Sequence, residues 1–209
     1  MYASRRAEGD GTAAQVTLIV LGKATHMGPG GEHMLSPRGD AVMKASVASY
    51  MMHKESGHKV RAYYTGGAPN FTVAQNAIPI LRRSVPGVSQ AELFRNIAVS
   101  HYGVQEGDTV AIAKGSDLMQ NLRNAKRRLD QDGARGIATV EIHVDGYQSG
   151  RAAMVAKSTF RGYEYSVRPA YAERGRAMAA FECCCYEPIE TVYMFAALRL
   201  HDLFEDRRK

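Results

Sequence analysis

Short apolar runs alternate along the chain with longer segments of mixed polarity. Five of the runs have the length of a β-strand, and they cover 16–21, 60–64, 109–113, 137–144 and 163–167. The first, third and fourth are rich in β-branched residues, which is typical of strands buried on both faces of a sheet. The second and fifth alternate more between apolar and polar residues, so we expect them nearer an edge of the sheet.

The segments between these runs have the periodicity of amphipathic helices. They cover 37–55, 89–102, 117–130 and 148–160, and a last helix is expected over 188–205. Ser36 is a suitable N-cap for the first helix, with Pro37 at its first position. Strands that alternate with helices form βαβ units, which place helices on both faces of a parallel sheet. The pattern therefore predicts a Rossmann-like, three-layer α/β sandwich with a mainly parallel sheet of about five strands.

The chain is expected to form one domain. Its 209 residues, of which 45% are hydrophobic, suit a single core, and the alternation of strands and helices continues without a linker. We expect this domain to cover 16–209 and a flexible, polar tail to cover 1–15. Segments 68–88 and 168–187 are the least regular and have room for further helices.

Glycine-rich loops follow the first four predicted strands. Ligands of an open parallel sheet bind beyond the carboxyl ends of its strands, where helix N-termini point into a crevice. Glycine lets a ligand approach the backbone closely, and free amides in such turns form anion sites. The loops cover 21–38, 65–70, 114–117 and 144–152. None contains the P-loop pattern, and no GxGxxG follows the first strand, so the sequence predicts an anion site of another kind.

The loop after the fourth strand carries the most informative side chain. Arg151 begins a helix directly after the segment Val144-Asp145-Gly146. An arginine there is suited to hold a phosphate or carboxylate through two hydrogen bonds, and the alternative is a local pair with Asp145. Lys23 and Lys114 in two of the other loops add positive charge to the same expected edge.

The net charge of +6 and the sequence pI of about 9.3 favour acidic partners, unless the basic side chains only cover solvated helix faces. A basic cluster occupies one predicted helix, but nearby aspartates answer it, so nucleic acid is an unlikely partner. The cluster is Arg123, Lys126, Arg127 and Arg128, and the aspartates are Asp117, Asp130 and Asp132.

Three adjacent cysteines, Cys183, Cys184 and Cys185, are poorly placed for a disulfide and lack the spacing of metal ligands. They favour a reducing compartment. No stretch approaches the roughly 20 apolar residues that a membrane span needs. The sequence therefore predicts a cytoplasmic protein with no membrane span.

Seven short motifs follow one another between residues 16 and 170. They are Leu21-Gly22, Leu35 with Arg38, Thr65-Gly66-Gly67, Ser89-Gln90-Ala91, Gly103-Val104, Gln120-Asn121 and Tyr147-Gln148-Ser149-Gly150-Arg151-Ala152. In order and spacing the series resembles the DUF218 family, which includes the SanA, ElyC and YdcF groups. The resemblance implies a single DUF218-like domain with a Rossmann-like fold, in agreement with the hydrophobic pattern.

The loops and the resemblance together predict one ligand site at the carboxyl edge of the sheet. Its predicted residues are Gly22, Lys23, Arg38, Thr65, Gly66, Gly67, Lys114, Gln120, Asn121, Asp145, Tyr147, Gln148 and Arg151. A nucleotide would also need an apolar slot for its base, for which Tyr63, Tyr64, Tyr147 and Met27 are candidates.

Three positions depart from the family pattern. Gln90 and Gln120 stand where the family has glutamate, and Gln148 stands where it has histidine. Glutamine forms hydrogen bonds but cannot exchange a proton near neutral pH. If those family positions act as acid and base, the chain would bind a ligand without turning it over. If they only hold a ligand, binding would be preserved, with a stronger preference for anions.

The leading hypothesis is a DUF218-like protein that binds a small anionic ligand. The resemblance implies a nucleotide, S-adenosylmethionine, or a phosphorylated or envelope-related metabolite, because the family is linked to bacterial envelope biogenesis and one group to S-adenosylmethionine. The sequence identifies neither the ligand nor the oligomeric state.

Two other classes remain open. One is an active transferase or hydrolase with altered catalytic groups, for which the nearest candidates are His26, Glu32, His33 and Glu92. The first three of these could also bind a metal, but a glycine-rich loop is a poor cage, and no metal is expected. The other class is a module that binds nucleic acid or a protein partner.

Overall fold

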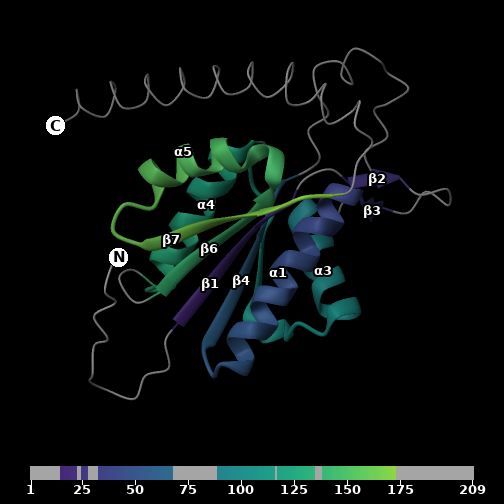
Figure 1. Cartoon of the computed structure of the whole chain (residues 1–209), viewed down its shortest axis with the longest axis horizontal. Coiled ribbons are helices and arrows are strands. Elements are labelled where there is room, and N and C mark those ends of the chain that lie inside the picture. The colour runs from purple at the N-terminus through teal and green to yellow at the C-terminus, as the bar shows by residue number, and fades with distance from the viewer. Residues whose placement is uncertain are drawn as a thin grey trace, which may run out of the picture.

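A five-stranded parallel sheet forms the centre of the protein (Figure 1). In this computed structural model its strands are β1 (Gln15–Leu21), β4 (Lys59–Thr65), β5 (Thr109–Ile112), β6 (Ala138–Asp145) and β7 (Glu164–Ala170). They lie in the order β5-β4-β1-β6-β7, and each neighbouring pair is parallel. The parallel sheet expected from the apolar runs is confirmed, with strand bounds close to the predicted ones.

The structure describes residues 15–22, 25–27, 33–67, 89–115, 117–134 and 138–172. Segment 68–88, the helix expected over 188–205 and the three cysteines lie outside these residues, as does the tail over 1–14. Gln15, expected to end the tail, is the first residue of β1.

Helices cover both faces of the sheet (Figure 1). Helices α1 (Pro37–Glu55) and α3 (Gln90–Tyr102) pack on one face, and α4 (Leu118–Gln131) and α5 (Ser149–Thr159) pack on the other. Two short 3₁₀ helices, η2 (Glu106–Asp108) and η3 (Gly146–Gln148), precede β5 and α5. The fold is therefore Rossmann-like, as the alternation of strands and helices predicts.

Alternate residues of β1 enter two separate cores. Leu18 and Val20 pack with α1 and α3, whereas Ile19 and Leu21 pack with α4 and α5. All of these side chains are almost completely buried. A central strand with apolar residues at successive positions suits this environment, since both of its faces are covered by helices.

The helix starts follow their local sequence. Ser36 caps α1, with its Oγ accepting a hydrogen bond from Gly39 N at 3.2 Å, and Pro37 is the first helical residue, as predicted. In α3, Ser89 Oγ accepts from Glu92 N at 3.1 Å while Glu92 Oε2 accepts from Ser89 N at 2.8 Å. This reciprocal pair is a capping box.

Two features differ from the sequence prediction. β4, expected near an edge, lies inside the sheet between β5 and β1, and the short β5 takes the edge opposite β7. Tyr63 on β4 reaches α4, donating its hydroxyl to Asp132 Oδ2 at 2.6 Å. A strand inside the sheet can thus carry polar side chains when a neighbouring helix supplies their hydrogen-bond partners, and for this reason the alternation in β4 did not indicate an edge strand. The expectation for β7 is confirmed, because β7 lies at an edge.

A hairpin formed by β2 (Thr25–Met27) and β3 (His33–Leu35) occupies part of the segment expected to be a loop after the first strand. Strands of three residues are too short to show a clear alternation, so the pattern gave no signal for them. Among the residues the structure describes, no helix is long and apolar enough to cross a membrane.

Candidate functional site

The strand order defines a topological switch point at the carboxyl edge of the sheet. From β1 the chain proceeds in one direction to β4 and β5, and in the other direction to β6 and β7. Loops therefore diverge where β1 and β6 lie side by side, which is the usual ligand position in open α/β sheets. Helices α1 and α5 lie on opposite faces of the sheet, and each begins near this edge.

The loops after β1, β4 and β5 meet through direct backbone hydrogen bonds. Gly22 N donates to Thr65 O at 2.9 Å, Gly66 N to Ile112 O at 3.3 Å and Gly67 N to Gly115 O at 2.9 Å. The structure thus brings together four predicted site residues, Gly22, Thr65, Gly66 and Gly67.

These contacts correct one expectation. We expected glycine amides of the loops to point at an anion, but the amides of Gly22, Gly66 and Gly67 already have carbonyl partners. The first amides of α3 are also engaged, since Gln90 N donates to Gly67 O at 3.1 Å and Ala91 N to Gly66 O at 3.0 Å. The glycines join neighbouring loops and the start of α3, and their N–H groups do not form an anion cradle.

Glycine is required here by close approach. A Cβ on Gly67 would lie 2.7 Å from Gly115 O, and one on Gly22 would lie 2.8 Å from Thr65 O. The Thr65 side chain is also engaged, since its hydroxyl donates to Val20 O at 3.3 Å. This part of the predicted site is a tightly packed support.

The predicted residues near β5 differ in exposure. Lys114 and Gln120 are exposed, and the Lys114 carbonyl accepts from Asn124 Nδ2 at 3.0 Å. Asn121 is buried in the first turn of α4, where its Oδ1 lies against the position that a Cβ on Gly115 would take. Lys23 lies outside the described residues.

A charged cluster lies where β6 ends. Asp145, the last residue of β6, is 1% exposed, and its Oδ2 is 3.2 Å from Arg38 Nε in the first turn of α1. Asp145 Oδ1 accepts from Tyr147 N at 3.3 Å. The Arg38 guanidinium also lies over the Tyr147 ring, 5.2 Å from its centroid. Three predicted site residues from α1, β6 and η3 thus converge.

Arg151 and Gln148 lie beside this cluster in the chain and are buried. Arg151, in the first turn of α5, is 3% exposed, and Gln148 is also buried just before the helix. The N-cap residue of α5, Gln148, makes no side-chain capping bond, whereas Ser36, Ser89 and Asp117 cap α1, α3 and α4. Asp145 pairs with Arg38, a partner from another element that the sequence did not indicate.

The sequence did not point to Tyr171, which adjoins the same cluster just after β7. Its ring lies against the Cα of Gly146, where a Cβ would collide with it, and meets the Tyr147 ring edge-on with centroids 6.2 Å apart. The only sequence signal for Tyr171 is its place at the carboxyl end of a strand.

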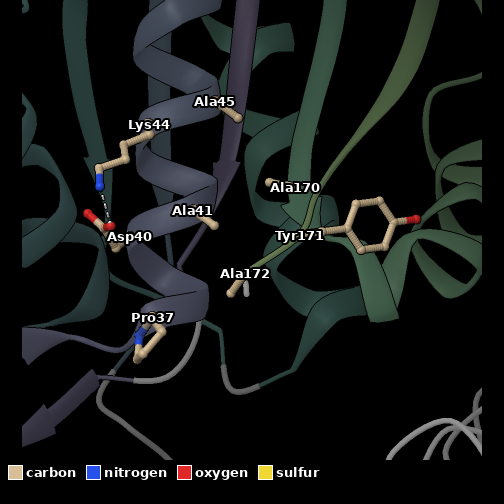
Figure 2. Close-up of a pocket in the computed structure, with 8 residues that line it drawn as sticks. All are labelled: Pro37, Asp40, Ala41, Lys44, Ala45, Ala170, Tyr171 and Ala172. Atoms are coloured by element: carbon tan, nitrogen blue, oxygen red, sulfur yellow. Dashed lines mark ion pairs between the residues drawn. The ribbon is translucent and has the colours of Figure 1, made fainter. Parts of the chain in front are cut away.

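A hollow of about 520 Å³ lies between the first half of α1 and the end of β7. Figure 2 shows Ala41 and Ala45 facing Ala170 across it, while the ring of Tyr171 points away. Asp40 and Lys44, which pair with each other at 2.8 Å, project to another side of α1. None of the twelve predicted site residues that the structure describes lines this hollow, and Tyr171 is the lining residue that also adjoins the charged cluster.

The prediction that Tyr63 and Tyr64 line a slot for a nucleotide base is wrong. Tyr63 and Tyr64 are fully buried, one in each of the two cores, and the Tyr63 hydroxyl donates to Asp132 at the C-terminal end of α4. Of the four candidates for this slot, Tyr147 remains, and the side chain of Met27 lies outside the described part of the structure.

Of the candidate catalytic groups, only the Glu92 side chain is described. The backbone N–H and the hydroxyl of Ser89 donate to its carboxylate and hold the pKa of Glu92 below its ordinary value. The geometry gives Glu92 a capping role. The side chains of His26, Glu32 and His33 lie outside the described residues. Within the described ranges, no group of three or more His, Cys, Asp or Glu side chains is arranged to hold a metal ion.

Sequence reasoning missed a buried polar group in the middle of β6. Glu141 is 4% exposed and accepts hydrogen bonds from Ser49 Oγ at 2.6 Å and Arg168 Nη2 at 2.8 Å. Nε2 of His143 and Nε2 of His53 lie 3.5 Å and 3.4 Å from its oxygens. His143 contributes most to holding the Glu141 pKa well below its ordinary value, and Ser49 and Arg168 act in the same direction. Glu141 and His143 alternate with apolar residues in the run over 137–144, so the sequence indicated a buried strand there without identifying its polar side chains.

The basic helix α4 pairs its charges locally. Arg128 Nε lies 3.1 Å from Asp132 Oδ1, and Lys126 pairs with Asp130. These i,i+4 pairs on an exposed helix are typical of a solvated surface.

The fold and the edge geometry define the class of this protein as a Rossmann-like α/β protein with a charged cluster at its topological switch point. No protein-family model matches the chain, and no curated protein matches its sequence.

Proposed function

We propose that the protein binds a small anionic ligand at the carboxyl edge of the sheet, beside the point where β1 and β6 part. The observation that carries this proposal is the pair of arginines, Arg38 and Arg151, in the first turns of α1 and α5. The two helices approach the edge from opposite faces of the sheet, and helix N-termini themselves favour negative charge.

Asp145 and Tyr147 fix the orientation of Arg38. The carboxylate lies 3.2 Å from Nε, and the guanidinium rests on the Tyr147 ring. A guanidinium held in this way loses little conformational entropy when it binds a phosphate or carboxylate. The start of α5 supports the same chemistry, because it adds the buried guanidinium of Arg151 to a helix N-terminus, which favours negative charge.

The glutamines favour binding over catalysis. Gln90, Gln120 and Gln148 can donate or accept hydrogen bonds but cannot transfer protons at neutral pH. Gln148 is buried next to the cluster and can serve as a neutral hydrogen-bonding group there. We therefore favour a DUF218-like binding protein, whose ligand is a nucleotide, S-adenosylmethionine, or a phosphorylated or envelope-related metabolite.

Thermal unfolding and calorimetry test the proposal directly. We expect AMP, ribose 5-phosphate, inorganic phosphate or S-adenosylmethionine to stabilise the protein, by about 2.7 kcal/mol at 100 times the dissociation constant. Arg151→Gln should weaken binding at least about tenfold, because it removes a charge-assisted contact.

The matched control is Arg128→Gln, on α4, whose arginine pairs with Asp132 on the exposed surface. It should bind as the wild-type chain does. Failure of all four compounds to bind, or an equal loss in the control, would contradict the proposal. Conversion of AMP or S-adenosylmethionine by the wild-type protein would favour the transferase or hydrolase alternative.

A further inference from the structure

Tyr171 is the most exposed large hydrophobic side chain at the charged cluster, with 65% of its surface accessible. We propose that Tyr171, together with Tyr147, stacks on a flat aromatic ring carried by the ligand. This inference rests on the proposed function and narrows it to an anion that bears an aromatic ring, of which a nucleoside monophosphate is the natural example.

The structure holds the Tyr171 ring in a defined position. Gly146 has no side chain, and the ring lies directly against its Cα. The edge-on contact with Tyr147, at an interplanar angle of 75°, gives the ring a second support. A tyrosine that is already ordered adds contact area at low conformational cost when a ligand stacks on it.

The rings and the charges belong to one cluster. Tyr147 carries the Arg38 guanidinium on its ring and contacts Tyr171 with the same ring. Gly146, under Tyr171, directly follows Asp145, whose carboxylate is paired with Arg38. A ligand whose anionic group reaches Arg38 therefore has its remaining part next to the two tyrosines. A flat ring fits this surface because aromatic faces stack with little dependence on the ring's substituents.

The experiment compares ligands that share a phosphate and differ in the ring. Calorimetry on the full chain measures the affinities of AMP, phenyl phosphate and ribose 5-phosphate. AMP and phenyl phosphate should bind about tenfold more tightly than ribose 5-phosphate, the advantage expected from one stacking contact. In Tyr171→Ala this ratio should fall to about one. Tyr171→Phe keeps the ring and should keep the ratio, and Tyr171→Leu, which lacks an aromatic ring, serves as the test variant if the alanine variant does not fold.

Met52→Ala is the control, since Met52 is an exposed apolar side chain in the last turns of α1, and the ratio should persist in it. Equal affinities in the wild-type chain, or a ratio that survives Tyr171→Ala, would overturn the inference while phosphate binding still supported the proposed function. A preference for AMP without one for phenyl phosphate would also overturn it, because hydrogen bonds to the base would then explain the selectivity. Failure of all three ligands to bind would overturn both proposals.

Discussion

Gly115 lies between the end of β5 and the first turn of α4, and its backbone contacts two other segments. Its carbonyl accepts from Gly67 N, and its Cα faces Asn121. Its φ of 115° lies in the region that residues with side chains rarely adopt. Position 115 therefore combines a backbone conformation and a close approach that only glycine satisfies.

Gly115→Ala should destabilise the protein by about 2 kcal/mol or more, from the unfavourable φ and the collision of the new Cβ with Asn121. Urea unfolding measures this loss. Gly107→Ala is the matched control, because its φ is not positive and a Cβ there meets nothing within 4 Å. Its effect should stay within about 0.5 kcal/mol. Equal stability of the two variants would contradict the steric argument.

At the residue scale the sequence predicted that the glycine-rich loops lie together, but it did not predict the hydrogen-bond partners of their backbone N–H groups. The partner of Gly22 is Thr65 and the partner of Gly67 is Gly115, so each contact joins residues more than forty positions apart. No local pattern encodes such pairings, since they depend on strand order. The same reason hid the contact between Arg38 and Asp145, although both residues were predicted separately.

Helix α3 shows how a short motif fixes one end of an element. The Ser89 hydroxyl accepts from Glu92 N and donates to Glu92 Oε2 at 2.7 Å. The Glu92 carboxylate also lies at the helix N-terminus, where negative charge is favourable. These contacts explain why the pKa of Glu92 is below its ordinary value.

Ser89→Ala should destabilise the protein by about 1 kcal/mol, which is typical for the loss of an N-cap, and should raise the pKa of Glu92 toward its ordinary value. Thermal or urea unfolding gives the first quantity, and an NMR titration of the Glu92 carboxyl gives the second. Ser100→Ala in the same helix is the control, since Ser100 is exposed and its hydroxyl contacts Asn96 O and His101 Nδ1 far from the helix N-terminus. A Glu92 pKa that does not move in Ser89→Ala would show that the Ser89 hydroxyl does not contribute to it and that the backbone N–H alone lowers it.

At the element scale, hydrophobic periodicity and caps predicted, with close bounds, the four α-helices and the five strands of the parallel sheet that the structure describes. The helix predicted over 188–205 lies outside the described residues. Periodicity failed for β2 and β3, which are too short to display it, and for the position of β4. The position of a strand within the sheet depends on whether neighbouring elements supply hydrogen-bond partners for its polar side chains. The Tyr63 hydroxyl has a partner in Asp132, the C-cap residue of α4, so β4 is stable inside the sheet.

At the scale of the whole molecule, three buried ionisable residues form a row along the face of β6 that packs against α1. Asp145, His143 and Glu141 occupy alternate positions of β6 and all three are buried, whereas the opposite face of the strand is apolar. Asp145 faces Arg38 at the start of α1, and Glu141 faces Ser49 and His53 further along the same helix. The β6 strand thus connects the proposed site with a charged group in the interior.

Stability should depend on the ionisation of Glu141. Because its folded-state pKa is lowered, the stabilisation is complete above the unfolded value of about 4.3 and is lost as the pH falls below it. Glu141→Gln removes the charge that Arg168, His143 and His53 face, so it should lower the free energy of unfolding at pH 7 by about 2–4 kcal/mol.

Urea unfolding of both proteins at pH 7 and at pH 3 tests this expectation. The difference between them should shrink at pH 3, because the wild-type protein then loses part of the stabilisation that Glu141→Gln lacks at any pH. Lys44→Gln, which breaks an exposed pair with Asp40, is the control and should leave the free energy of unfolding at pH 7 almost unchanged. A difference of the same size at both pH values would mean that Glu141 stabilises the fold through its shape and packing and not through its charge.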